Sequence, residues 1–255
     1  MKSTHKWRFP TVEELLSHGV PDWECHVHSD YSDGKSDLTA IVERALQIGL
    51  THVAVTEHTE TDLTAGPGWF ARYCDEMSHL KRVCAGRLQL GVGVEVPAAD
   101  YDGGLDWGES QPEACDFILG AVHVFPDVGW LYDMGLELDP YRVIELEYRA
   151  LMGLARNPQL DAIAHPGGLS NRYRKPFPDA LLDEVIAEAA RHEIALEWNP
   201  AYHDDAERFL LMCAKHDARV APGSNAHAPK GMGGARAGLR QAREALLASV
   251  DSPLR

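Results

Sequence analysis

The stretch Trp23-Glu24-Cys25-His26-Val27-His28 decides how the rest of the chain is interpreted. It is a short, mostly apolar run that ends in two histidines, and the polar turn residues Asp33 and Gly34 follow it. Similar runs recur along the chain, and most are separated by longer segments with helical periodicity. We predict strands at residues 23–28, 51–58, 88–95, 116–123, 160–165, 194–198 and 219–224.

The segments between these runs carry helix signals. Thr11-x-x-Glu14 is a capping-box pattern, and Asp139-Pro140 places an N-cap before a proline at the first helical position. Apolar residues recur at helical spacing in several further segments. We expect helices after Thr11, over 38–46, 69–84, 139–155, 178–192 and 204–216, and in a last segment that ends near residue 248.

Strands that alternate with helices indicate a mostly parallel α/β sheet. Seven such units in 255 residues suit a closed or nearly closed barrel better than an open sheet. A doubly wound open sheet is the alternative, but it would normally carry a glycine-rich phosphate loop after its first strand. Gly91-Val92-Gly93 lies inside a predicted strand and is a weak match to such a loop. We expect one domain over residues 1–255.

Composition excludes several classes of protein. The formal net charge is −15, which argues against a general nucleic-acid or membrane binder. We find no apolar run long enough to span a membrane and no secretory signal at the N-terminus. The five cysteines form no C-x-x-C pair, so we expect free thiols and a cytoplasmic location.

Metal-capable side chains stand at or just after the end of each predicted strand. In a β/α barrel, this end of the sheet carries the active site. A lone histidine at a strand end is usually structural, but six of the 13 histidines fall in this one layer. Glu95 lies between Val94 and Val96, where a carboxylate is costly to bury unless it is paired or binds a cation. Imidazole and carboxylate ligands suit zinc, manganese or iron, in a site with two or more ions.

The residues that carry this pattern resemble the polymerase-and-histidinol-phosphatase (PHP) superfamily. The resemblance covers about residues 22–235, and within the superfamily it is strongest to histidinol-phosphate phosphatases. It implies a distorted (β/α)7 barrel whose metal site lies at the carboxyl ends of the strands. The motifs are His26-Val-His28 with Asp33, Thr56-Glu57-His58, Gly93-Val-Glu95, Ala121-Val-His123, Ala164-His165-Pro166 and Ser224-Asn225-Ala-His227.

The resemblance also implies two to three divalent ions (Zn, Mn or Fe) and their ligands. The first ion would use His26, His28, Glu95 and position 225; the second Glu95, His123 and His165; the third Asp33, His58 and His227. Two positions depart from the family pattern. Glu57 replaces an aspartate and is expected to support the ligands. Asn225 replaces a metal-binding aspartate, and a neutral amide donates less charge and cannot act as an acid or base.

The expected function is hydrolysis of a small phosphorylated metabolite by metal-activated water. Glu95, Asn225 and His227 are the expected catalytic residues, with His227 or a metal-bound water as the candidate proton donor. Arg172, Arg174, Lys175 and Asn199 are expected to bind substrate, and Arg236 is a weaker candidate. The alternatives are a PHP phosphodiesterase or nucleotide phosphatase, and a metal-binding module that Asn225 impairs catalytically. The sequence leaves the substrate, the ions and the oligomeric state open.

Overall fold

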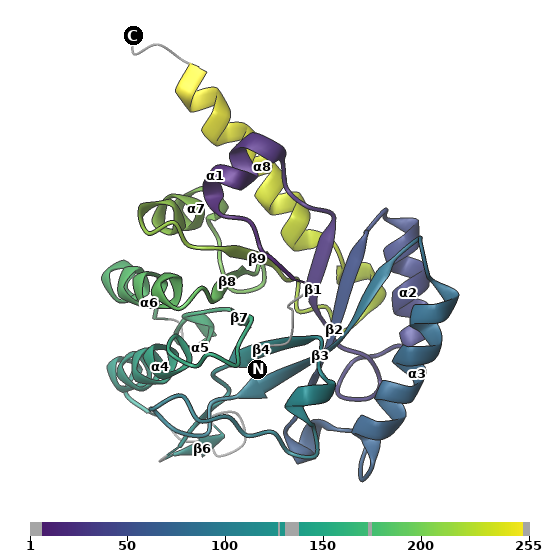
Figure 1. Ribbon diagram of the computed structural model, residues 1–255. Coiled ribbons are helices and arrows are strands. Elements are labelled where there is room, and N and C mark those ends of the chain that lie inside the picture. The colour runs from purple at the N-terminus through teal and green to yellow at the C-terminus, as the bar shows by residue number, and fades with distance from the viewer. Residues whose placement is uncertain (1–6, 127, 131–137, 173–174, 252–255) are drawn as a thin grey trace.

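The structure, a computed structural model, describes residues 7–126, 128–130, 138–172 and 175–251 (Figure 1). Its main sheet has seven parallel strands in the order β1-β2-β3-β4-β7-β8-β9. All seven predicted strands are confirmed, and the doubly wound alternative is wrong. The strands are β1 Trp23–Val27, β2 His52–His58, β3 Gln89–Pro97, β4 Phe117–Ala121, β7 Ala162–Ile163, β8 Ala195–Trp198 and β9 Val220–Pro222.

The sheet is nearly closed into a barrel, and the closure differs at its two ends. At the carboxyl end, Val27 of β1 forms an isolated parallel bridge with Ala226, which follows β9. There the His28 N–H donates to the Ala226 carbonyl at 3.1 Å, and the Ala226 N–H donates to the His26 carbonyl at 3.2 Å. At the other end, the Val220 N–H donates to the Pro10 carbonyl at 2.9 Å. The barrel is therefore distorted, because the chain ahead of the first helix pairs with its last strand.

Helices surround the sheet (Figure 1). The capping box at Thr11 is confirmed: the Glu14 N–H donates to Thr11 Oγ1 at 3.3 Å, and the Thr11 N–H donates to Glu14 Oε2 at 2.9 Å. Short α5 and the two-stranded β5–β6 pair were not predicted, because elements of two to five residues are too short to show periodicity. The helices and short strands are α1 Val12–His18, α2 Leu38–Gln47, η1 Thr61–Leu63, α3 Trp69–Val83, η2 Pro112–Ala114, β5 Val124–Phe125, β6 Gly129–Trp130, α4 Pro140–Leu154, α5 Gly168–Arg172, α6 Asp179–Arg191, α7 Ala206–Lys215, η3 Pro229–Gly231 and α8 Gly234–Asp251.

Side chains alternate along the strands between the helix layer and the barrel interior. In β2, Val53 and Val55 pack in the large core that includes helix side chains, whereas Ala54 belongs to a second, smaller core. That second core combines alanines from several strands with Trp7 and Phe9 from the N-terminal segment. His58 shares the face of Ala54, because residues two and four apart on a strand point the same way. Alanines and a few large aromatic side chains thus fill the barrel interior below the ring of predicted ligands.

Two expectations from composition concern the whole chain. All five cysteines are free thiols, as expected. Within the described ranges, every helix is too short or too polar to cross a membrane. The expected cytoplasmic location stays a prediction.

Candidate metal centre

The Glu95 carboxylate lies at the centre of the histidine cluster. Its Cα is in register with that of His58 on β2, so both side chains stand at the same edge of the sheet. The side chain is completely buried. Its Oε1 lies 3.0 Å from His165 Nε2 and 3.2 Å from His123 Nε2, and its Oε2 lies 3.2 Å from His26 Nε2, 3.3 Å from His58 Nδ1 and 3.5 Å from His28 Nε2. A single carboxylate thus faces five imidazoles, two within strands β1 and β2 and three in the segments that directly follow β1, β4 and β7.

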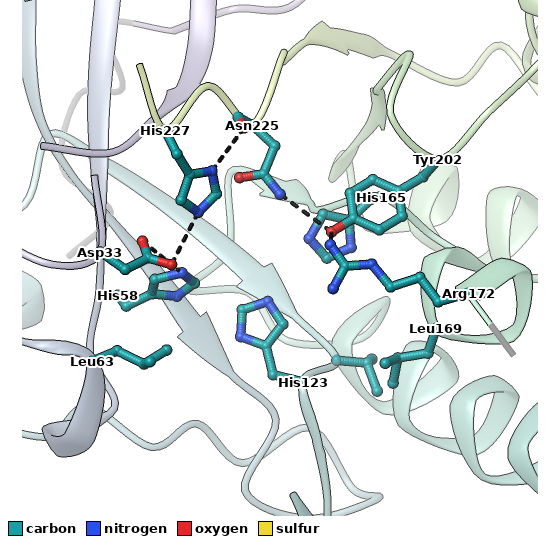
Figure 2. Close-up of a pocket in the computed structure, with 11 residues that line it drawn as sticks. Asp33, His58, Leu63, His123, His165, Leu169, Arg172, Tyr202, Asn225 and His227 are labelled. Carbon is teal, nitrogen blue, oxygen red and sulfur yellow. Dashed lines mark hydrogen bonds and ion pairs between the residues drawn. The ribbon is translucent and has the colours of Figure 1, made fainter. Parts of the chain in front are cut away.

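The predicted ligand sets come together in space. His26, His28 and Glu95 form one group of potential metal ligands, and Glu95, His123 and His165 form a second. Asn225 Oδ1 lies 3.0 Å from His28 Nε2, next to the first group. In the third set, Asp33 lies 3.5 Å from His58 Nε2 and 3.1 Å from His227 Nε2 (Figure 2). The structure brings all nine residues together, and their binding of ions stays a prediction.

The donor atoms fit divalent ions. Nitrogen and oxygen ligands about 2.0–2.1 Å from one ion lie about 3–3.4 Å from each other, depending on coordination geometry. The contacts of Glu95 and the 3.1 Å separation between His26 Nε2 and His28 Nε2 are close to this range. Three buried atoms here make no hydrogen bond, namely Glu95 Oε2, His28 Nδ1 and His58 Nδ1. A carboxylate oxygen buried without a hydrogen bond is costly unless a cation faces it.

Charge at the site follows from burial and from the central carboxylate. Burial raises the pKa of Glu95, but His26 and His123 outweigh burial and hold that pKa well below its ordinary value. Burial lowers the pKa of His123, and Glu95 and Glu60 overcome this and raise it to about 10. Burial, together with neighbouring His58 and His26, holds the pKa of His28 well below its ordinary value. His28 therefore favours the neutral imidazole, which is the form that binds a metal.

Two glutamates orient the predicted ligands, although neither had a predicted role. Glu60 Oε1 lies 2.7 Å from His123 Nδ1, and Glu197 Oε1 lies 2.7 Å from His26 Nδ1. Each carboxylate accepts a hydrogen bond from the Nδ1–H, so that the Nε2 lone pair of the histidine faces the cluster. Glu197 was visible as a polar residue in a strand end, and Glu60 as a carboxylate two residues after His58. Their imidazole partners became apparent only in the structure.

Glu197 also holds the backbone of His165. The His165 N–H donates to Glu197 Oε2 at 2.6 Å, and His165 has a φ of 25°, which non-glycine residues rarely adopt. A Cβ at Gly223 would lie 1.9 Å from Glu197 Oε1, so this position must be glycine for the carboxylate to fit. Glu197 therefore connects the first and second ligand groups.

Glu57 acts on the loop that follows β1. Its carboxylate accepts hydrogen bonds from the Ser29 N–H, the Ser29 hydroxyl and the Ser32 hydroxyl. Burial raises the pKa of Glu57 to about 7. This residue therefore fixes the loop that carries Asp33, which agrees with the supporting role expected from the sequence.

A cavity of about 190 Å³ opens beside the cluster (Figure 2). Arg172 lines it from the end of α5, with Tyr202 beside it. The start of α5 is held by buried Glu147, which accepts hydrogen bonds from the Leu169 N–H at 3.0 Å and the Ser170 N–H at 2.8 Å. The lining residues are Asp33, His58, Leu63, Val122, His123, His165, Leu169, Arg172, Tyr202, Asn225 and His227.

Among the described residues, the other predicted substrate contacts do not line this cavity. Asn199 is completely buried, and its Oδ1 accepts a hydrogen bond from the Ala201 N–H at 3.0 Å, so it stabilises a turn. The Lys175 ammonium lies 3.8 Å from the centre of the Tyr141 ring. Arg236 lies in α8, where it pairs with Asp22 at 2.6 Å. These side chains are occupied elsewhere in the fold, whereas Arg174 lies outside the described residues.

Comparison with protein families matches the PHP domain to residues 24–214. The chain therefore belongs to the PHP domain family, whose match lies inside the span of about 22–235 expected from the motifs. The expectation of a single domain over residues 1–255 stays a prediction.

Relatives and solved structures agree with this membership. The chain is 25% identical over 216 residues to a "Probable phosphatase" of Caldicellulosiruptor bescii and 26% identical over 216 residues to one of Caldicellulosiruptor saccharolyticus, covering 80% of this chain and 79% of the relative in both cases. A histidinol phosphate phosphatase from Lactococcus lactis, solved with zinc, L-histidinol and phosphate, has the same fold with a TM-score of 0.65, 21% identity, and coverage of 86% of this chain and 93% of that one. With these relatives and its histidine–glutamate clusters, the chain is a hydrolase of the metal-dependent phosphoesterase type.

Proposed function

We propose that this chain hydrolyses a small phosphate monoester of the histidinol-phosphate type. The observation that carries the proposal is the Glu95 carboxylate, which faces five imidazoles directly beside a cavity that Arg172 lines. The small size of the cavity supports a metabolite as substrate. The structural neighbour that holds L-histidinol and phosphate supports the same class of ester.

The nine predicted ligands would hold the ions. Bound divalent ions would supply water activation near neutral pH and neutralise charge on the phosphoryl oxygens. Glu95 would hold the ion sites together, because its two oxygens face different ligand groups. Glu60 and Glu197 would keep the imidazoles of His123 and His26 in the tautomer that presents Nε2.

Residues around the cavity would bind and orient the ester. The Arg172 guanidinium is a planar donor suited to phosphoryl oxygens. Leu63, Val122 and Leu169 provide an apolar wall, which would exclude water from that side of the substrate. The arrangement supports binding of one phosphate group between the ligand cluster and Arg172.

Metal analysis combined with a phosphate-release screen tests the proposal. The panel contains histidinol phosphate, a mononucleotide, 4-nitrophenyl phosphate, a cyclic phosphate and bis(4-nitrophenyl) phosphate, each with and without EDTA. We expect bound divalent ions and EDTA-sensitive release from monoesters, and no release by Glu95→Gln. Preference for the diesters would favour the phosphodiesterase alternative. Full metal loading without activity on any ester would favour the impaired binding module.

A further inference from the structure

Tyr202 occupies a fixed place in the wall of the cavity. It lies in a turn held by Asn199, whose backbone carbonyl accepts a hydrogen bond from the Tyr202 N–H at 3.1 Å. The Tyr202 ring lies 4.5 Å from the His165 ring, measured between centroids. A Cβ at Gly168 would come within 2.8 Å of Tyr202 Cδ1, so the absence of a side chain at residue 168 lets the ring sit there. Packing thus determines the direction of the phenol.

Two donors converge on the Tyr202 hydroxyl. The Arg172 guanidinium donates a hydrogen bond to it, and Asn225 Nδ2 donates at 3.4 Å (Figure 2). The guanidinium carbon also lies 4.8 Å from the centre of the phenol ring. A positive charge at the phenolic oxygen stabilises the phenolate that remains after the proton leaves. The hydroxyl is therefore suited to give a proton to a group in the cavity.

His227, the side-chain acid expected from the sequence, has a second predicted role. His227 Nδ1 lies 3.0 Å from the Asn225 carbonyl, which can only accept, so Nδ1 carries a proton and is held by it. His227 Nε2 faces Asp33 in the third ligand set, and a nitrogen that binds an ion has no proton to donate. The side-chain amide of Asn225 is not an acid. His227 thus cannot both bind an ion through Nε2 and donate a proton from it. Tyr202 can act as the proton donor while His227 binds an ion.

We propose that Tyr202 is the proton donor to the leaving oxygen, an inference that rests on the proposed phosphomonoesterase function. The oxygen of water forms a bond to phosphorus, and the ester P–O bond breaks with its electron pair on the leaving oxygen. The phenolic proton of Tyr202 moves to that oxygen and gives an alcohol. The proton that water loses returns through solvent to the phenolate, so that protons balance over one turnover.

The test compares two esters that differ in how much their leaving groups need a proton. Benzyl phosphate releases a strongly basic alkoxide, whereas 4-nitrophenyl phosphate releases a weakly basic phenolate that can leave unprotonated. For Tyr202→Phe in the metal-loaded enzyme, we expect kcat on benzyl phosphate to fall at least ~100-fold and kcat on 4-nitrophenyl phosphate to change less than ~3-fold. The phenyl ring of the variant keeps the contact with His165, and metal content is measured alongside.

Tyr148→Phe is the matched control, because this tyrosine bonds to Glu184 outside the cavity. It should leave kcat on both esters unchanged. Equal losses on the two esters in Tyr202→Phe, or no loss on either, would overturn Tyr202 as the donor while leaving the proposed function standing. A metal-loaded wild type that releases phosphate from neither ester would overturn the proposed function itself, and the inference with it.

Discussion

Glu197→Gln should weaken metal binding without touching any of the nine predicted ligands. The wild-type Oε1 accepts a hydrogen bond from His26 Nδ1 at 2.7 Å, and Oε2 accepts from the His165 N–H at 2.6 Å and from Asn199 Nδ2 at 3.3 Å. Glutamine offers one acceptor and one donor in the same space. The backbone N–H of His165 cannot change, so the glutamine oxygen must face it and the amide NH₂ must face His26. His26 Nδ1 then has to accept, which moves its proton to Nε2.

That proton stands where an ion would bind, because His26 Nε2 lies 3.2 Å from Glu95 Oε2. Loss of such an outer partner typically lowers metal affinity about 10- to 100-fold. We expect the affinity of the first ligand group for zinc to fall by this factor. In the metal-free protein, removing the charged acceptor should also lower the free energy of unfolding by about 1.5–3 kcal/mol.

Competition with a chromogenic chelator measures zinc affinity, and urea unfolding in EDTA measures the stability of the metal-free protein. Glu207→Gln, on the exposed face of α7, is the control for the change in net charge. Zinc affinity within about twofold of wild type would refute the reasoning. Either His26 would not be a ligand, or its tautomer would not depend on Glu197.

Three further expectations follow from the site. Asn225→Asp should raise metal occupancy, and turnover with it, because an anionic oxygen replaces a neutral one 3.0 Å from His28 Nε2; flat occupancy in metal analysis would remove residue 225 from the ligand set. Arg172→Ala should raise KM about 10- to 100-fold by removing a charge-assisted donor, whereas Lys215→Ala, which removes an equal charge from α7, should not; equal KM values for both variants would place Arg172 outside the substrate site. Burial raises the pKa of Glu147 from 4.5 to about 7, so the unfolded state ionises first as pH rises. As pH rises between these values, the free energy of unfolding of the wild type should fall by up to about 3 kcal/mol relative to that of Glu147→Gln. Urea unfolding of both proteins at pH 4.5 and 7.5 measures this, and the same difference in free energy of unfolding at both pH values would contradict the expectation.

Much of the fold was predictable because its signals are local. Each β-strand is an apolar run a few residues long, and the helix starts at Thr11 and Asp139 are capping patterns of adjacent residues. The predicted ligands were visible because parallel strands place their carboxyl ends at one edge, whatever the order of the strands. Tyr202 had no such signal, since it follows β8 in an irregular turn. Only its hydrogen bonds with Arg172 and Asn225, which are distant in sequence, indicate a role.

The sequence by itself determined the seven strands, the identity of the polar ring at their ends, and the chemistry of imidazole and carboxylate that such a ring can support. Only the tertiary structure decided which members touch. Closure of the barrel between Val27 and Ala226 brings Asn225 to His28 across 197 positions of sequence. The same packing brings Glu60 to His123 Nδ1 and Glu197 to His26 Nδ1. It also places the Lys175 ammonium over the Tyr141 ring. Local patterns specify which face of an element a side chain occupies, but contacts between distant elements depend on how the whole sheet curves and closes.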